Sequence, residues 1–529
     1  MSLPESTEVK RGAKARYAGL SSDRQQFLDR AREASKLTIP SLVPPEGHNG
    51  TSELYKPYQS LGARGVNNLS ARLLMTLFPT NQPFSRLRID ESELKKEIDA
   101  NPELKTELDE ALSKAERKLQ NEIETSGIRR TAFQILKNLV VSGNILTYTP
   151  PKGGLKAYGL SQYVVLRDHA GNLLEVILKE TLAPASLPKE YQQYCVKTDS
   201  KEVLKSVDLY THVKLCADGD EWDAYQEVCD VIIIESIGTY KKELNPWNAI
   251  RWTEIQGENY GRGHIEDCYG DLQSLEGLTQ AIVEGSAAAA KVLFLVNPNG
   301  TTTAKNIAKT PNGGFAEGSR DDVHCLQLEK FNDFRVAKET IADLSDRLNK
   351  AFLLNSSIQR SGERVTATEW RYMVEELETA LGGVYAVLSQ TFQLPLVTLI
   401  IANLQKLNKF PKFPKDSIRP QIVTGLEALG RSSDLNKLDQ FVAEMGQLLG
   451  PEAIAKFVNP TEFLTRRATA LGIDTKNLIR TKEEIDAQDQ ASQQQQSLSQ
   501  VAPQLIKSGA DMINTNKKLG AQQAPTQPA

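Results

Sequence analysis

Cysteine is scarce in this chain of 529 residues. Its five cysteines are Cys195, Cys216, Cys229, Cys268 and Cys325, and no two of them have C-x-x-C spacing. So few cysteines cannot form a disulfide framework, and the spacing excludes the usual paired-cysteine zinc sites. Histidine is equally scarce, with five residues and no pair spaced for a metal site on one helix. We therefore expect a reducing compartment, no metal and no cofactor.

The motifs of common enzymes are also missing. No Gly-Lys dipeptide occurs, which excludes a Walker A loop, and neither H-E-x-x-H nor G-x-S-x-G is found. The run Gly261-Arg262-Gly263-His264 resembles the start of a dinucleotide fingerprint, but Glu266 takes the place of the third glycine, so we interpret it as a turn before a helix. Asp218 and Asp220 lack the EF-hand pattern and indicate a hairpin turn. We expect no catalytic residues and no enzyme.

Neither an excess of one charge nor a long hydrophobic run is present. Lys and Arg total 63 against 67 Asp and Glu, a net charge of −4, which argues against a protein that grips nucleic acid over its whole surface. The apolar run 394–404 is shorter than the roughly 20 residues of a membrane span, and the N-terminal residues lack the apolar region of a signal peptide. We expect a soluble, intracellular protein that contacts no membrane.

Apolar spacing of three and four predicts helices over much of the chain. We expect an amphipathic helix from Ser60 to Pro79, a charged helix within 91–125, and a buried helix that passes into a short strand within 131–151. Between about 155 and 260 the β-rich runs predict a small antiparallel sheet, with turns at Ala170-Gly171-Asn172 and Asp218-Gly219-Asp220. The fold class is therefore mixed α+β and mainly helical.

The second half is predicted to be helical. A helix from about Ile265 to Lys291 becomes small-sided at 285–290, which favours either a buried bundle helix or a helix packed among identical copies. The helix predicted next, 334–353, follows a Gly/Asn/Pro-rich segment and a short apolar run at 323–328. Later helices are expected from Thr366 to about Gln405, with interruptions at Gly382-Gly383 and Leu394-Pro395, and at 432–449, 451–458 and 460–470, before a Gln-rich end.

Five long segments between about Leu20 and Arg480 carry a more specific signal than any short motif. They are GARGVNNLSARLLMTLFP, KNLVVSGNILTY, YGDLQSLEGLTQAIVEGSAAAAKVLFLVNP, LNSSIQRSGERVTATEWRYMVEELETALGGVYAVLSQTFQLPLV and VTGLEALGRSSDLNKL. In this order they resemble the portal protein, or head-to-tail connector, of short-tailed bacteriophages (podoviruses). The resemblance implies a portal-protein fold that assembles as a ring, typically of twelve subunits.

The resemblance also implies a division of the chain into named parts. The parts are an N-terminal wing (1–264, with the small sheet at about 155–260), stem helix 1 (265–292), a clip (293–333), stem helix 2 (334–354), a tunnel loop (355–366), a return helix with a linker (367–431), a helical crown (432–489) and a Gln-rich, disordered tail (490–529).

The function implied is that of a DNA conduit at the unique capsid vertex of the virion. The ring would dock the terminase for DNA packaging, then the tail adaptor, and would pass DNA during ejection through the host cell envelope. The implied partners are further copies of the chain, double-stranded phage DNA, terminase, the tail adaptor and tail proteins, the major capsid protein, the scaffolding protein and internal core proteins. During assembly the protein would be in the host cytoplasm. Twelve copies at −4 each would carry −48, so most of the ring would repel the duplex.

Apolar residues of the two stem helices are the first candidate site. The residues expected to pack the stem lie on apolar stripes of these helices and are Leu275, Ile282, Ile341, Leu344 and Leu348. We expect Ile341, Leu344 and Leu348 to face neighbouring helices in the ring. The alternative is that they belong to the core of one subunit.

The second candidate site is the clip. Its few apolar anchors, Ile307 and Phe315, stand among polar residues that include Lys305 and Lys309. A segment with so little to bury is expected to be a docking surface.

The third candidate site is the tunnel loop. Gly362 gives it a permissive backbone position, while Thr366 and Glu369 form a capping box that starts the next helix. Arg360 and Arg364 are thereby left on a flexible connector, where the resemblance implies that they contact DNA. The alternative is that both arginines pair with Glu363, Glu369 or wing carboxylates.

Two other functions remain open from the sequence. The chain could be a nucleic-acid motor or nuclease subunit of the packaging machinery, which an ATPase and nuclease assay would reveal. It could also be a helical scaffold that assembles without DNA passage. Negative-stain images separate this from a portal, because only a portal forms a ring with an axial hole.

Overall fold

The chain divides into two compact units, Met1–Ala428 and Leu429–Ala529. The computed structural model describes residues 12–79, 84–89, 102–195, 205–289, 293–311, 313–326, 331–354, 383–407, 418–422 and 440–448, together with positions 381, 410, 463, 464 and 467. In the second unit residues 440–448 are helical, within the helix predicted at 432–449. The helices predicted at 451–458 and 366–380 lie outside the described residues.

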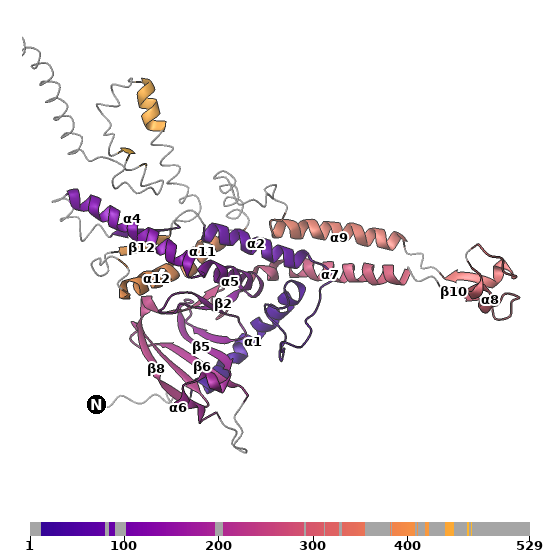
Figure 1. Ribbon diagram of the computed structural model, residues 1–529, viewed down its shortest axis with the longest axis horizontal. Helices are drawn as coiled ribbons and strands as arrows, with labels where there is room; N and C mark the ends of the chain where they lie inside the picture. Colours follow the sequence, from indigo (N-terminus) through magenta and orange to yellow (C-terminus); the bar gives the residue numbers. More distant parts are fainter. Residues whose placement is uncertain are drawn as a thin grey trace, which may run out of the picture. The chain divides into compact units, whose positions relative to one another are not determined.

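An antiparallel five-stranded sheet occupies the region where the sequence predicts one (Figure 1). Its order is β4-β5-β6-β7-β8, with bounds β4 Tyr163–Arg167, β5 Leu173–Leu182, β6 Val207–Leu215, β7 Glu221–Val228 and β8 Val231–Lys241. Both predicted hairpin turns are confirmed, since Ala170-Gly171-Asn172 joins β4 to β5 and Asp218-Gly219-Asp220 joins β6 to β7. Gly171 and Gly219 have φ of +89° and +79°, values that favour glycine at these turns.

A second sheet has three strands in the order β3-β2-β9. The strand β9 (Trp247–Arg251) pairs with β2 (Asn144–Tyr148), and β3 (Lys156–Tyr158) covers the other edge of β2. The single sheet expected over 155–260 is therefore two sheets. The helix α5 (Ile128–Ser142) runs directly into β2 through Gly143, which has φ of +70° and donates its N–H to Leu139 O. This is the helix-to-strand passage that the sequence predicts.

The helix α1 (Ala13–Leu37) lies against the five-stranded sheet (Figure 1) and was not anticipated from the sequence. Its side chains Leu28 and Ala31 share an apolar cluster with the sheet residue Val176. Its buried face also contains Arg24, whose Nη1 donates to the Tyr17 hydroxyl and to the Ser161 and Tyr163 carbonyls. Because the buried face of α1 contains an arginine and alanines, its apolar residues do not recur at a clear helical period.

The main core is helical. It unites α2 (Leu61–Leu77), α5, α7 (His264–Ala289), α9 (Phe331–Ala351) and α12 (Leu394–Lys406), and α4 (Pro102–Thr125) contributes Leu119 and Ile123. A small antiparallel pair, β1 (Ser85–Ile89) with β12 (Ile418–Ile422), adds Leu87 to the same core. The remaining short elements are α6 (Lys189–Gln192), β10 (Leu293–Val296), α8 (Ala304–Lys309), β11 (Val323–Leu326) and α11 (Val384–Leu388).

The helix predicted to be interrupted at Pro395 changes its winding there. A π-helical turn, η5 (Ser389–Gln393), connects α11 to α12. Pro395 has no N–H to donate, so the Thr391 carbonyl lacks its usual helical partner. It instead accepts a hydrogen bond of 2.6 Å from the Asn248 side chain of β9.

The same helical run is long and apolar enough to cross a membrane. Residues Val384–Lys406 contain an 18-residue stretch with mean hydropathy 1.6, of which 56% is buried. Buried side chains such as Leu396, Val397 and Ile400 belong to the main core, which accounts for this hydropathy.

Candidate functional site: the paired helices and the segment between them

The helices α7 and α9 run side by side in opposite directions (Figure 1). At one end, the His264 Nε2 atom lies 3.1 Å from the Ala351 carbonyl oxygen. At the other end, a Cβ atom on Gly285 would lie 2.9 Å from the Phe334 ring, so glycine permits the helices to approach there. The two helices expected to form the stem are thus a packed antiparallel pair within one chain.

The inner half of this pair belongs to the core of the single chain. Leu275, Leu344 and Leu348 are 2%, 7% and 0% exposed, and Ile341 packs half-buried against the same core. The surface of these leucines is already covered by their own chain, as the alternative of an intrasubunit core describes. That Ile341, Leu344 and Leu348 face neighbouring helices in the ring stays a prediction.

The outer half of the pair is open. On α7, Ile282 is half-buried and Val283 is 49% exposed, and the small residues Ser286, Ala287 and Ala288 follow them on the surface. On α9, Val336 is 59% exposed. Of the five residues expected to pack the stem, Ile282 alone lies in this outer half. The exposed valines were not predicted from the sequence, because they lie outside the apolar stripes. The residues of those stripes lie mainly in the inner half of each helix.

The segment between the two helices folds around a buried carboxylate. The chain leaves α7 for β10, which pairs with β11 before α9 begins. Asp322, 9% exposed, accepts hydrogen bonds from the Thr302 N–H and hydroxyl and from the Thr301 hydroxyl. These bonds, led by that from the Thr302 N–H, lower the pKa of Asp322. A Cβ on Gly300 would lie 2.2 Å from this carboxylate, so that position excludes a side chain.

The residues proposed for docking lie on the surface of this segment. Lys305 and Lys309 are exposed on α8, where Ile307 is half-buried. Phe315 is fully exposed, which is a large apolar area for one side chain to offer to solvent. The structure thus places all four on the outside of the segment.

The tunnel-loop residues Arg360 and Arg364 lie outside the described residues, so their contacts stay a prediction. Within the part of the chain that the structure describes, no group of three or more His, Cys, Asp or Glu side chains is arranged to hold a metal ion.

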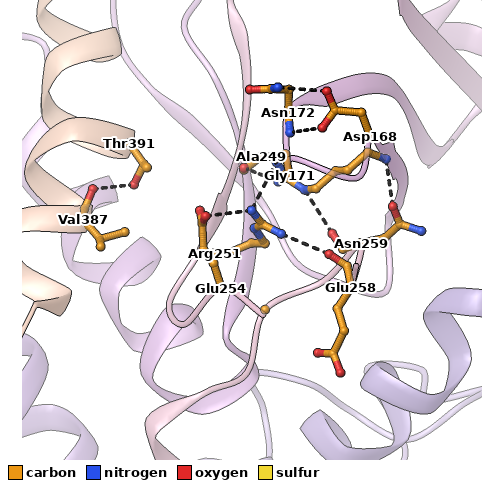
Figure 2. A network of polar contacts seen from close by, with 12 residues as sticks. Asp168, Gly171, Asn172, Ala249, Arg251, Glu254, Glu258, Asn259, Val387 and Thr391 are labelled. Atoms are coloured by element: carbon orange, nitrogen blue, oxygen red, sulfur yellow. Dashed lines mark hydrogen bonds and ion pairs between the residues drawn. The ribbon is translucent and has the colours of Figure 1, made fainter. Parts of the chain in front are cut away.

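A polar network fixes the connector from the sheets to α7, and sequence reasoning missed it (Figure 2). Arg251 at the end of β9 is 4% exposed and forms an ion pair of 2.9 Å with Glu254. It also donates a hydrogen bond of 3.1 Å to the Glu258 carbonyl. Arg167 at the end of β4 donates to three carbonyls, those of Gly171, Ala249 and Asn259, at 2.8–3.0 Å. Burial, helped by the charge of Arg251, lowers the pKa of Arg167 to about 10.

The glycine run before α7 completes this connector. The Asn144 side chain both donates to and accepts from the Gly261 backbone at 2.7 Å. A Cβ on Gly263 would lie 2.7 Å from the Val141 carbonyl, so the backbone passes too close to α5 for any side chain. Residues 261–263 are therefore the turn before a helix that the sequence predicts, and they set where α7 begins.

Comparisons with known proteins match the chain over most of its length. Residues 10–479 match the family model of the bacteriophage head to tail connecting protein. The portal protein of Enterobacteria phage T3 is 42% identical over 481 residues, 90% of this chain and 89% of the relative. That of Escherichia phage T7 is 42% identical over 493 residues, 92% and 91% of the two chains.

A solved structure of the neck of a native gene transfer agent particle, computed with C12 symmetry, is similar with a TM-score of 0.36 and 10% identity, covering 78% of this chain and 90% of that one. The resemblance to portal proteins of short-tailed phages is confirmed by the sequence relatives. Their names and that of the family describe a connecting role in the virion and indicate no catalysis. The chain belongs to the bacteriophage head to tail connecting proteins, the family that contains these phage portal proteins.

Proposed function

We propose that copies of this chain form a ring at the unique capsid vertex, through which double-stranded DNA passes into and out of the head. The single observation that carries the proposal, beside family membership, is the open outer half of the α7–α9 pair. Val283 and Val336 are about half exposed there, and on α7 small side chains follow Val283. Small residues let helices approach closely, and exposed apolar side chains on adjacent helices favour a protein partner. A further copy of the same pair fits this surface.

In this proposal 265–292 and 334–354 are the stem, and 293–333 is the clip that docks first the terminase and then the tail adaptor. The exposed lysines of α8 and the exposed Phe315 ring support docking. The segment is held by the hydrogen bonds of Asp322, to which these side chains do not contribute. Residues 1–264 and 367–431 form the wing, which would meet capsid and scaffolding proteins. The tunnel loop at 355–366 and the crown at 432–489 complete the channel, next to internal core proteins.

Electron microscopy of the purified chain tests this function. Negative-stain images should show rings with an axial hole, and a filament or a monomer would reject the proposal. Val283→Asp with Val336→Asp should abolish the rings, since charges would then be desolvated between copies. The matched control is Ile234→Asp with Ile237→Asp on β8, which introduces the same two charges at exposed aliphatic residues, 71% and 61% exposed, away from this helix pair.

A further inference from the structure

Two cysteines that are far apart in the chain lie against each other beside the five-stranded sheet. Cys195 follows α6, and Cys229 lies in the turn between β7 and β8. Their sulfur atoms are 3.7 Å apart, and both are free thiols. Cys195 is fully buried in a small apolar cluster with Leu187, Tyr191 and Val228, whereas Cys229 is partly exposed at the edge of that cluster.

The backbone at Cys229 is unusual for its residue type. Cys229 and Asp230 have φ of +49° and +62°, which is the pattern of a two-residue hairpin turn of type I′. Such turns favour Asn, Asp or Gly at both positions, because these residues adopt positive φ at little cost. The conformation of the turn therefore does not explain why a cysteine occupies its first position. Residues that break a local rule in this way tend to be functional.

The hydrogen bonds of the pair show which thiol meets a reagent first. The Cys229 S–H donates to Cys195 Sγ, while the Cys195 S–H donates to the Tyr191 carbonyl at 3.6 Å. Burial, together with the contact to Cys229, raises the pKa of Cys195 to about 11. The buried thiol is therefore protected, and the accessible one is Cys229.

We propose that Cys195 and Cys229 are a redox modification site that closes to an intrachain disulfide by exchange with a low-molecular-weight disulfide. The Cys229 thiolate attacks one sulfur of the reagent, forms a mixed disulfide and releases one thiolate. Cys195 then loses its proton to solvent and attacks Cys229 Sγ, which breaks the mixed disulfide and releases the second thiolate. The two cysteines lose two electrons and two protons, and the reagent becomes two thiols. The sulfurs must approach by about 1.7 Å to reach bonding distance.

The bond would fasten a turn that already anchors other elements. On β7, Glu227 accepts from the Ala13 N–H at 2.6 Å and so caps the first turn of α1. Lys14 of α1 pairs with Asp230 of the turn at 3.3 Å. Linking Cys229 to Cys195, 34 positions earlier, would tie the α6 segment to this anchor. The oxidised chain should resist local opening of α6 and the β7–β8 turn more than the reduced chain does.

Oxidised glutathione is the probe for the full-length chain. After incubation, alkylation in denaturant and digestion without reductant, mass spectrometry should find Cys195 and Cys229 in one cross-linked peptide pair, with two of the five thiols lost. Cys195→Ser should leave Cys229 as a lasting mixed disulfide with glutathione. Cys229→Ser should leave Cys195 unmodified.

The variant Cys216→Ser serves as the matched control, because Cys216 stands at the opposite end of β7 and should not affect the cross-link. The wild-type chain alone decides the proposal and needs no variant to fold. A stable mixed disulfide at Cys229, an unreacted pair, or a cross-link between other cysteines would overturn it.

Discussion

The Glu276 carboxylate of α7 accepts a hydrogen bond of 2.7 Å from the Tyr55 hydroxyl. The same carboxylate accepts from the backbone N–H groups of Tyr58 at 2.9 Å and Gln59 at 3.2 Å. The hydrogen bond to Glu276, followed by burial and the carboxylate charge, raises the pKa of Tyr55 to about 12. One buried side chain thus binds the loop before α2 to the helix expected to form the stem.

Removing this carboxylate should destabilise the fold. Glu276→Ala leaves two backbone donors without their acceptor, and Glu276 is only 5% exposed, so we expect the free energy of unfolding to fall by about 1–3 kcal/mol. Urea denaturation measures the change. The matched control is Glu284→Ala, two turns further along α7, whose carboxylate accepts from the exposed side chains of Tyr58 and Gln280. Equal losses in the two variants would contradict the role given to Glu276.

The Glu175 carboxylate makes stability depend on acid pH. Burial alone would raise the pKa of Glu175, but hydrogen bonds from His212 at 2.7 Å and Arg16 at 2.8 Å lower it to about 2. A carboxyl with a lowered folded-state pKa stabilises the protein above its unfolded value near 4.5, and this stability is lost as the pH falls toward 2. We expect the free energy of unfolding to decline through that window. In Glu175→Gln the decline should be shallower, and an unchanged slope would refute the assignment.

The helices α7 and α9 could be predicted because their apolar residues recur at helical spacing. The stripe Ile341, Leu344, Leu348 lies on the covered face of α9, and the helix bounds agree within three residues of the expected 334–353. What covers that face could not be read from spacing, since a core and a subunit interface have the same period. The resemblance favours the interface, whereas Leu344 and Leu348 are already buried within the single chain.

Other parts depend on tertiary contacts that spacing does not record. The pair β1–β12 joins residues more than 300 positions apart, so neither short strand has a local signal. Arg251 would pass for a surface charge in the sequence, yet it is buried because carbonyls from a distant hairpin and a nearby loop surround it. The turns at Gly171 and Gly219, by contrast, were predictable from their glycines, whereas the β7–β8 turn at Cys229 and Asp230 has no glycine to signal it.

Inner and outer positions of the stem should respond differently to truncation. Leu348→Ala removes a fully buried side chain and should lower the free energy of unfolding by about 2–5 kcal/mol while rings still form. Val336→Ala, at a side chain 59% exposed, should leave unfolding nearly unchanged and weaken ring assembly. Denaturation and sedimentation of the same samples test both. If Leu348→Ala instead weakened ring assembly and Val336→Ala lowered stability, Leu348 would belong to the subunit interface.

The lysines of α8 should matter for docking and not for assembly. Deletion of 301–312 would test docking poorly, because it removes Thr301 and Thr302 and leaves the Asp322 carboxylate without its donors. Lys305→Glu with Lys309→Glu keeps that network and reverses two exposed charges. Rings should persist, while binding of purified terminase should fall at least tenfold in a sedimentation assay.

The matched control for this clip variant is Lys241→Glu with Lys242→Glu, which reverses two adjacent exposed lysines at the end of β8. It changes the net charge by the same amount. If both double variants bind terminase alike, general charge and not the clip governs docking.

The tunnel-loop arginines provide the sharpest test of the DNA path. If Arg360 and Arg364 contact phosphates, Arg360→Ala with Arg364→Ala should keep the ring and terminase docking and yet lose packaged DNA faster. Phosphate contacts are electrostatic, so the difference from wild type should be large at low salt and shrink at high salt. Replacement of both by Lys keeps the charges and should restore retention. Packaging and leakage are measured separately, and equal leakage of the Ala variant and wild type at both salt concentrations removes these arginines from the DNA path.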